Sequence, residues 1–134
     1  MQKIKLYNAH CCGEIGDVVL AIDDLNFKSP KQGSVELFKD QYWRNFFLNE
    51  PRGGVFKHCN IIVKPSDPNA NAGFIIMEPE DNPPMSGSNC ICVTTVLLEG
   101  NARVIFVTAV RTCLDVIVGD AGLFVEVCKP SASK

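Results

Sequence analysis

The sequence of 134 residues lacks an excess of charge of either sign. Its 13 lysines and arginines are balanced by 15 aspartates and glutamates, and the formal net charge is −2. Proteins that bind nucleic acid or anionic membranes usually carry a basic face or stripe. We therefore expect no nucleic acid and no membrane among the partners of this chain.

Long apolar runs are missing as well. No stretch approaches the roughly 20 apolar residues that a membrane-spanning helix needs, and residues 1–5 are not followed by the apolar run of a secretory signal peptide. The seven cysteines are an odd number, so they cannot all pair within one chain. Together these features predict a cytoplasmic location with free thiols.

The sequence also lacks the ligand spacing of a metal site. Cys11 and Cys12 are adjacent, Cys90 and Cys92 have a single residue between them, and the two histidines lie far apart. Structural zinc sites use cysteine pairs separated by two to four residues, often together with a histidine pair. We therefore expect no metal.

What the sequence does contain is the composition of one globular domain, with 46% hydrophobic and 21% charged residues. The first two of its expected strands form a hairpin that turns at Gly13 and Gly16, and 23–33 is a loop. The expected fold is α+β, in which 1–134 is a single domain with a mostly antiparallel sheet curled around a central apolar helix. Apolar runs predict strands over 3–9, 18–22, 55–64, 72–77, 104–107, 114–118 and 122–127.

Two helices are predicted. The first covers 34–49 with Ser34 as its N-cap, and the second covers 85–99 with Gly100 just after its end. The second is apolar on nearly all sides and is expected to be buried all round. The first carries an aromatic stripe at helical spacing, which is typical of core packing, formed by Val35, Phe38, Tyr42 and Phe46 and widened by Trp43 and Phe47.

The best candidate site is the segment Ser86, Gly87, Ser88 and Asn89, at the start of the second predicted helix. Free backbone N–H groups and the positive end of the helix dipole point into one small volume there, and small residues let an anion approach closely. The Ser86 hydroxyl would face the carbon next to that anion. The alternative is a serine N-cap followed by glycine, which is common in helices and which the pattern alone favours.

Four ordered blocks make the sequence similar to a known family. A His followed by Gly-Glu lies within 9–14, Glu-Pro-Arg-Gly occupies 50–53, Gly-Phe-Ile-Ile-Met occupies 73–77 and Met-Ser-Gly-Ser-Asn occupies 85–89. Their order and spacing resemble the proline racemase family, which includes 4-hydroxyproline 2-epimerases and trans-3-hydroxyproline dehydratases. The resemblance is good over 4–100 and looser over 101–128.

This resemblance implies a fold and a reaction. The family's enzymes have two similar lobes of the diaminopimelate epimerase-like fold, and this chain would be the N-terminal lobe alone, in a truncated form. The substrate carboxylate lies between two helix N-termini, and one acid–base group from each lobe faces the α-carbon. No cofactor takes part. The implied function is epimerisation or dehydration of 3- or 4-hydroxyproline through removal of the α-proton.

The resemblance also assigns roles to residues. Ser86 stands where racemases have a catalytic cysteine, as it does in family members that act on 3-hydroxyproline. Gly87 and Asn89 keep the cradle for the substrate carboxylate, and Ser88 replaces the usual histidine of that substrate-binding segment. His58 takes a pocket-lining position and is expected to contact the substrate hydroxyl, with a partly exposed strand histidine as an equal alternative.

Three further residues are interpreted as having no direct part in catalysis. Cys90 is not interpreted as the base, and Glu14 is interpreted as a turn carboxylate. Arg52 is expected to fix its loop by bonding carbonyl groups rather than to touch substrate.

The resemblance implies two kinds of partner. One is a small amino acid, hydroxyproline or proline. The other is a second copy of the chain or a separate second lobe, which would complete the site. The alternative function is that of a non-catalytic carboxylate-binding protein or a structural relic.

Overall fold

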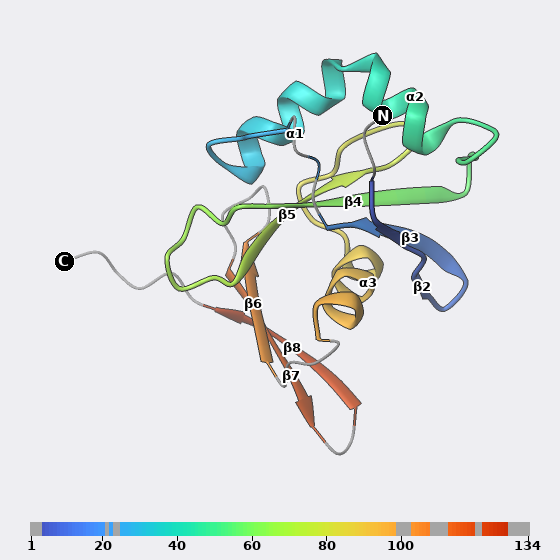
Figure 1. Cartoon of the computed structure of the whole chain (residues 1–134). Helices are drawn as coiled ribbons and strands as arrows, with labels where there is room; N and C mark the ends of the chain where they lie inside the picture. The colour runs from blue at the N-terminus through green and yellow to red at the C-terminus, as the bar shows by residue number, and fades with distance from the viewer. Residues whose placement is uncertain are drawn as a thin grey trace.

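The computed structural model describes residues 4–20, 22 and 25–98, together with the backbone of 103–107, 113–119 and 122–128. Figure 1 shows the arrangement of its helices and strands. In chain order these are β1 (Leu6–Tyr7), β2 (His10–Cys11), β3 (Glu14–Val19), α1 (Pro30–Lys39), α2 (Gln41–Leu48), β4 (Lys57–Val63), β5 (Ala72–Met77), α3 (Gly87–Leu97), β6 (Arg103–Val107), β7 (Cys113–Gly119) and β8 (Gly122–Cys128).

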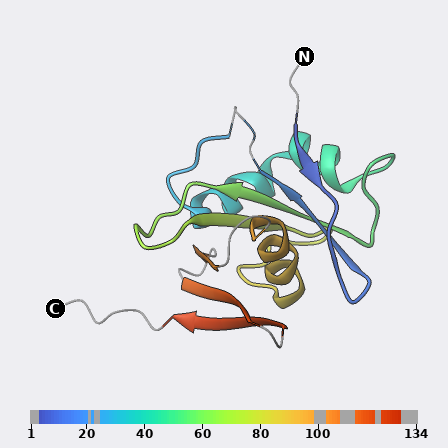
Figure 2. The ribbon, with the colours of Figure 1, turned by 60° about the horizontal axis from the view of Figure 1, so that its bottom comes forward.

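The strands form one sheet in the order β1-β3-β4-β5-β6-β7-β8, and β2 also pairs with β3. β3 runs parallel to β4 and β5 runs parallel to β6, whereas the other pairs are antiparallel. Figures 1 and 2 show the sheet curling, so that α3 lies between strands β3–β5 and strands β6–β8. The predicted α+β fold, a mostly antiparallel sheet around a central helix, is confirmed.

Successive residues of β3, β4 and β5 point to opposite faces of the sheet, and both faces are covered. One core cluster lies between the sheet and α3, and it is formed by strand residues Val18, Phe74 and Ile76 and by helix residues Cys90, Cys92 and Val93. The other lies between the sheet and α1 and α2, and it is formed by strand residues Val19, Ile61, Ile75 and Met77 and by helix residues Leu37, Trp43 and Phe47. β5 is buried along its whole length because helices lie on both sides of it, which explains its unbroken apolar run.

The N-terminal hairpin is present, but it turns at one place only. Cys12 and Gly13 form the turn between β2 and β3, with φ angles of 51° and 91°. Gly13 is suited to this left-handed backbone because it has no Cβ. Gly16 is not part of the turn, contrary to the prediction, and lies inside β3 opposite His58 of β4.

The predicted helix over 34–49 is two helices, so that prediction is wrong in its start and its continuity. α1 begins earlier, with Ser29 as its N-cap and Pro30 at its first position, and the Ser29 hydroxyl accepts a bond from the Gln32 N–H at 3.2 Å. Asp40 then ends α1 and caps α2, since its carboxylate accepts from the N–H groups of Tyr42 and Trp43 at 2.9 and 3.3 Å.

This break also changes which aromatic residues reach the core. Val35, Phe38 and Tyr42 are 53%, 46% and 68% exposed, so the predicted core stripe is wrong for these three. Trp43 and Phe47 are buried, as expected. A single helix would have kept all of these residues on adjacent faces, but the bend at Asp40 turns α2 relative to α1.

α3 is the central helix of the prediction, although it is not buried all round. Val93 and Thr94 are buried, whereas Thr95 is exposed. Its start, with Ser86 as the N-cap residue, agrees with the sequence. The predicted end at Gly100 lies outside the described residues.

Candidate functional site

The N-terminus of α3 has no side-chain cap. Ser86 has the extended backbone of an N-cap residue (φ −148°, ψ 126°), but its hydroxyl makes no bond to a helix N–H group. The Ser86 Oγ instead accepts a hydrogen bond from Nδ2 of Asn89 at 3.0 Å and lies 3.3 Å from the Ser88 Oγ. The first N–H groups of α3 are thus left available to an anion, which favours the binding interpretation over a plain serine cap.

Asn89 connects this helix end to the sheet. It is buried, and its Oδ1 accepts a hydrogen bond from Nδ2 of Asn60 on β4 at 2.8 Å. Its Nδ2 lies 3.1 Å from Nδ1 of His58 and 3.3 Å from Oε1 of Glu78. Because the same Nδ2 also contacts Ser86, one amide group holds together a serine, a histidine and a carboxylate.

His58 lies between two carboxylates. It sits on β4, its side chain is 14% exposed, and its Nδ1 is 3.4 Å from Oε1 of Glu14 and 3.6 Å from Oε1 of Glu78. Glu14 begins β3 and Glu78 follows β5, so the two strands that flank β4 bring them together. The structure therefore links His58 to Ser86 through the side chain of Asn89, and Ser86 lies beside Ser88.

Sequence reasoning missed two members of this cluster and gave a third a smaller part. Asn60 was given no role, although it is two residues after His58 on the same strand and therefore faces the same side. Glu78 was also missed, and its only signal is that it is the first polar residue after the apolar run of β5. Glu14 was interpreted as a turn carboxylate, whereas it also contacts His58.

Arg44 fixes the loop that carries Glu78. It is a buried residue of α2, and its guanidinium donates to the backbone oxygens of Glu78 and Pro79 at 2.8 and 3.0 Å. A third bond goes to the Asn82 Oδ1 at 2.5 Å, and Asn82 Nδ2 in turn donates to the Ser34 backbone oxygen at 3.0 Å. The loop between β5 and α3 is thereby tied to the helices on the other face of the sheet.

A family model described as proline racemase matches residues 6–129. The chain belongs to the proline racemase family. It is 28% identical to a hydroxyproline epimerase from Agrobacterium vitis, solved with bound trans-4-hydroxy-L-proline, with a TM-score of 0.78 over 93% of this chain and 42% of that one. A probable proline racemase from Agrobacterium radiobacter K84, solved with bound carbonate, is 29% identical, with a TM-score of 0.76 over 96% of this chain and 38% of that one.

The same comparisons show how the length of this chain relates to the length of its relatives. The chain spans about two fifths of the length of both proteins. A phenazine biosynthesis protein of the PhzF family from Bacillus anthracis matches 92% of this chain and 39% of its own at 14% identity and a TM-score of 0.57, which shows the fold alone. The resemblance to one half of a proline racemase, with its diaminopimelate epimerase-like lobe, is confirmed.

Two structural observations bear on metals and membranes. Within the described ranges, no three His, Cys, Asp or Glu side chains gather as metal ligands would. Nor does any helix among them have the length and apolar character to cross a bilayer.

Burial keeps the cysteines of α3 in the thiol form. Cys90 and Cys92 are buried, and burial raises the pKa of Cys90 to about 11 and also raises the pKa of Cys92. A thiol that stays protonated near neutral pH is a poor base and a poor nucleophile. This agrees with the prediction that Cys90 is not the base of this proline racemase-type lobe.

Alkylation of the folded chain is expected to separate these thiols from Cys12, which is exposed in the hairpin turn. Iodoacetamide at mildly alkaline pH should modify Cys12 and leave Cys90 and Cys92 unmodified, as measured by peptide mass spectrometry. The same treatment in guanidinium chloride is the control, and there all three should react. A modified Cys90 in the folded chain would contradict the buried, protonated thiol.

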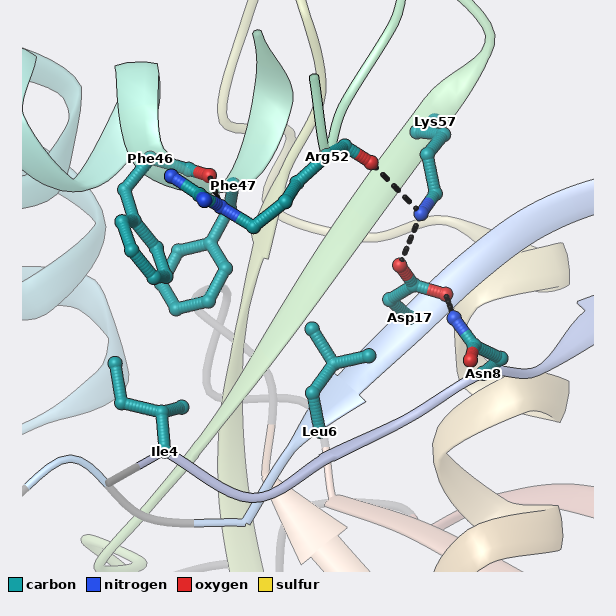
Figure 3. Close-up of a pocket in the computed structure, with 8 residues that line it drawn as sticks. All are labelled: Ile4, Leu6, Asn8, Asp17, Phe46, Phe47, Arg52 and Lys57. Carbon is teal, nitrogen blue, oxygen red and sulfur yellow. Dashed lines mark hydrogen bonds and ion pairs between the residues drawn. The ribbon is translucent and has the colours of Figure 1, made fainter. Parts of the chain in front are cut away.

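A concavity lies on the face of the sheet opposite to α3, between α2 and the N-terminal strand (Figure 3). Its volume is about 350 Å³, and it is lined by Ile4, Leu6, Asn8, Asp17, Phe46, Phe47, Arg52 and Lys57. The Asp17 carboxylate is paired with the Lys57 Nζ at 2.7 Å and accepts from the Asn8 Nδ2 at 2.9 Å. These polar groups satisfy one another, and they link the residue after β1 to β3 and β4.

Arg52 lines the same concavity. Its Nε donates to the Phe46 backbone oxygen at 3.2 Å, and its guanidinium stacks 4.1 Å from the centre of the Phe46 ring. The expected role of Arg52, to hold its loop through a carbonyl group, is thus borne out by the contacts (Figure 3).

Proposed function

We propose that the chain supplies one side of a proline racemase-type site that acts on 3- or 4-hydroxyproline. The α-proton is removed without a cofactor, and the outcome is epimerisation or dehydration. The observation that carries this proposal is the uncapped N-terminus of α3 with Ser86, Asn89 and His58 gathered around it. The bound trans-4-hydroxy-L-proline in a 28% identical relative supports the choice of substrate class.

The first N–H groups of α3 would hold the substrate carboxylate. Among the described residues, and apart from the neighbouring residues and backbone of α3 itself, no atom lies within 4 Å of the position that a Cβ on Gly87 would take, so the backbone there is open to a close approach. Ser88 and Asn89 complete the cradle, and the helix dipole favours negative charge at this point. The same groups would stabilise the charge that develops on the carboxylate when the α-proton leaves.

Ser86 is the proposed catalytic residue. A serine hydroxyl is a far weaker acid than a thiol with a pKa of about 8.5, so it acts as a neutral hydrogen-bonding group or proton donor rather than as a thiolate-like base. Such a group suits a reaction in which the 3-hydroxyl must leave. His58 would contact the substrate hydroxyl from the neighbouring strand.

One lobe contacts the substrate from one side only. We propose that the chain is a single domain equivalent to the N-terminal lobe of the family, and that a second lobe or a second copy completes the site. The short span relative to its relatives favours a second candidate function, a carboxylate-binding protein without turnover. Size-exclusion chromatography with light scattering would show whether the chain pairs with itself.

Binding and turnover test the proposal. Calorimetry with pyrrole-2-carboxylate, a planar analogue of the deprotonated substrate, is expected to show binding, and chromatography on a chiral phase would follow trans-3- and trans-4-hydroxyproline. Binding without turnover would support the carboxylate-binding alternative, and the absence of both would overturn the proposal.

Replacing Ser86 by alanine is expected to lower turnover by about 100-fold or more, because it removes the proton-donating group next to the substrate. Thr95→Ala is a matched control, since it deletes an exposed hydroxyl from the same helix far from its N-terminus. Unchanged turnover in Ser86→Ala would place the active site elsewhere.

A further inference from the structure

The concavity between α2 and the N-terminal strand (Figure 3) lies on the other side of the sheet from the start of α3. Lys57 of β4 lines it, whereas His58, the next residue of the strand, belongs to the cluster around Asn89. Successive strand residues point to opposite faces, so the thickness of the sheet separates the two places. A ligand in the concavity would therefore not compete with one bound at α3.

Two cations and one carboxylate line this concavity. The Asp17 side chain is 5% exposed, and its two oxygens are engaged by the Lys57 Nζ at 2.7 Å and by the Asn8 Nδ2 at 2.9 Å. Lys57 thus neutralises the charge of Asp17, whereas Arg52 has no carboxylate partner in the described part of the chain. One net positive charge remains in the lining, which favours an anion.

Arg52 and Lys57 also have N–H groups left for a ligand. A guanidinium has five N–H donors, and among the described residues only the Nε of Arg52 has an acceptor, the Phe46 backbone oxygen at 3.2 Å. Its face rests on the Phe46 ring, so the terminal nitrogens can still bond in the plane of the group. The Lys57 Nζ donates to Asp17 and to the Arg52 backbone oxygen at 3.1 Å, which leaves one of its three protons.

The rest of the lining is mostly apolar. It is supplied by Ile4, Leu6, Phe46 and Phe47, and Leu6 is 38% exposed. In Figure 3, Arg52 and Lys57 lie along one side of the concavity, and Ile4 and Leu6 lie along the other. A volume of about 350 Å³ is at the lower end of the range for small-molecule pockets, which are typically apolar with a few polar groups.

We propose that this concavity is a second ligand site, for a small monocarboxylate whose body is apolar, such as a single aromatic ring. The carboxylate pairs with the terminal N–H groups of Arg52, because the edge of a guanidinium matches a carboxylate with two parallel bonds. The apolar body covers Leu6 and the phenylalanine rings. A zwitterionic amino acid fits poorly, because its ammonium group would meet two cations and no free carboxylate.

A matched pair of probes tests the charge of the ligand. 3-Phenylpropionate and 3-phenylpropan-1-ol have the same body, and only the first carries a carboxylate. Titration of the ¹⁵N-labelled full chain, followed by amide NMR, is expected to shift the signals of Leu6, Arg52 and Lys57, with a Kd of about 1 mM or below for the acid. The alcohol should bind about tenfold more weakly.

Substitutions at exposed positions separate the charge from the apolar contact. Arg52→Met should weaken binding of the acid about tenfold and abolish the difference between the two probes. Leu6→Ala should weaken both probes by a similar factor, because it removes apolar contact alone. Lys64→Met is the matched control, since Lys64 is an exposed cation just after the other end of β4, and it should change neither affinity. The amide spectrum of each variant also reports whether it is folded.

Four results would overturn the second site as proposed. Shifts confined to 86–89 would place the carboxylate of the probe at α3, and the absence of shifts at about 20 mM would show that the concavity binds neither probe. Equal affinities for the two probes would exclude recognition of the anion. Signals of Leu6 and Arg52 that shift on dilution of the chain alone would show that a second copy covers this face. The proposed function at α3 has its own tests, since the two places share no residue.

Discussion

Replacing Arg44 by methionine is expected to lower the free energy of unfolding by about 3 kcal/mol. The guanidinium is buried and supplies three hydrogen bonds, to the backbone oxygens of Glu78 and Pro79 and to the side chain of Asn82. Methionine keeps the apolar stem but leaves these acceptors without a donor, and each unsatisfied buried acceptor costs about 1–3 kcal/mol. Urea denaturation followed by circular dichroism would measure the change.

Arg52→Met is the matched control for this prediction. Arg52 is exposed and makes one bond to a backbone oxygen, so the same substitution there should change the stability by less than about 1 kcal/mol. Equal effects of the two substitutions would show that the buried bonds of Arg44 do not stabilise the fold. The Arg44 variant should also loosen the loop that carries Glu78.

Local patterns were sufficient to predict the parts of the fold in which one face or both faces are apolar. The run 72–77 gave β5 with its observed bounds, and the three C-terminal runs gave β6, β7 and β8 to within a residue or so. The start of α3 was also predictable, because a serine followed by small residues precedes its apolar run. These elements follow from side chains that are near one another in sequence.

The helices before β4 show where local patterns stop being sufficient. Both the break at Asp40 and the start at Ser29 depend on side chains that bond nearby N–H groups, which competes with apolar periodicity. The periodicity continued through Asp40 without a sign of the bend. The prediction therefore placed Phe38 and Tyr42 in the core, although both are exposed.

The candidate site shows a second limit of sequence reasoning. Ser86, Ser88 and Asn89 are consecutive or nearly so, and the family blocks carry them together. Glu78 and Asn60 reach the same point only because β4 and β5 are neighbours in the sheet and the loop after β5 is held by Arg44. Neither residue type is unusual at its place in the sequence, so only the fold could assign them to the site.

Gly16 lies where the sheet and α3 approach closely, and its substitution by alanine is the second large effect that we expect. A Cβ at Gly16 would lie 2.8 Å from the Asn89 Oδ1, 3.0 Å from the Cys92 Sγ and 3.2 Å from the Asn60 Nδ2. All three residues are buried and the two asparagines are hydrogen-bonded to each other, so α3 must shift or the Asn60–Asn89 bond must break. Overpacking of this kind costs about 1–3 kcal/mol.

Gly16→Ala should therefore lower both the stability and the affinity for pyrrole-2-carboxylate, because Asn89 positions Ser86 and His58 through the same amide group. Gly87→Ala separates the two effects. A Cβ there would meet no atom of the described residues within 4 Å beyond its own helix and chain neighbours, so the stability of this variant in urea should stay within about 1 kcal/mol of the wild type while its affinity for the analogue falls. If Gly16→Ala were as stable as Gly87→Ala, the approach of β3 to α3 would leave room for a Cβ at position 16. The hydrogen bond between Asn60 and Asn89 would then be the contact that holds the start of α3 against the sheet.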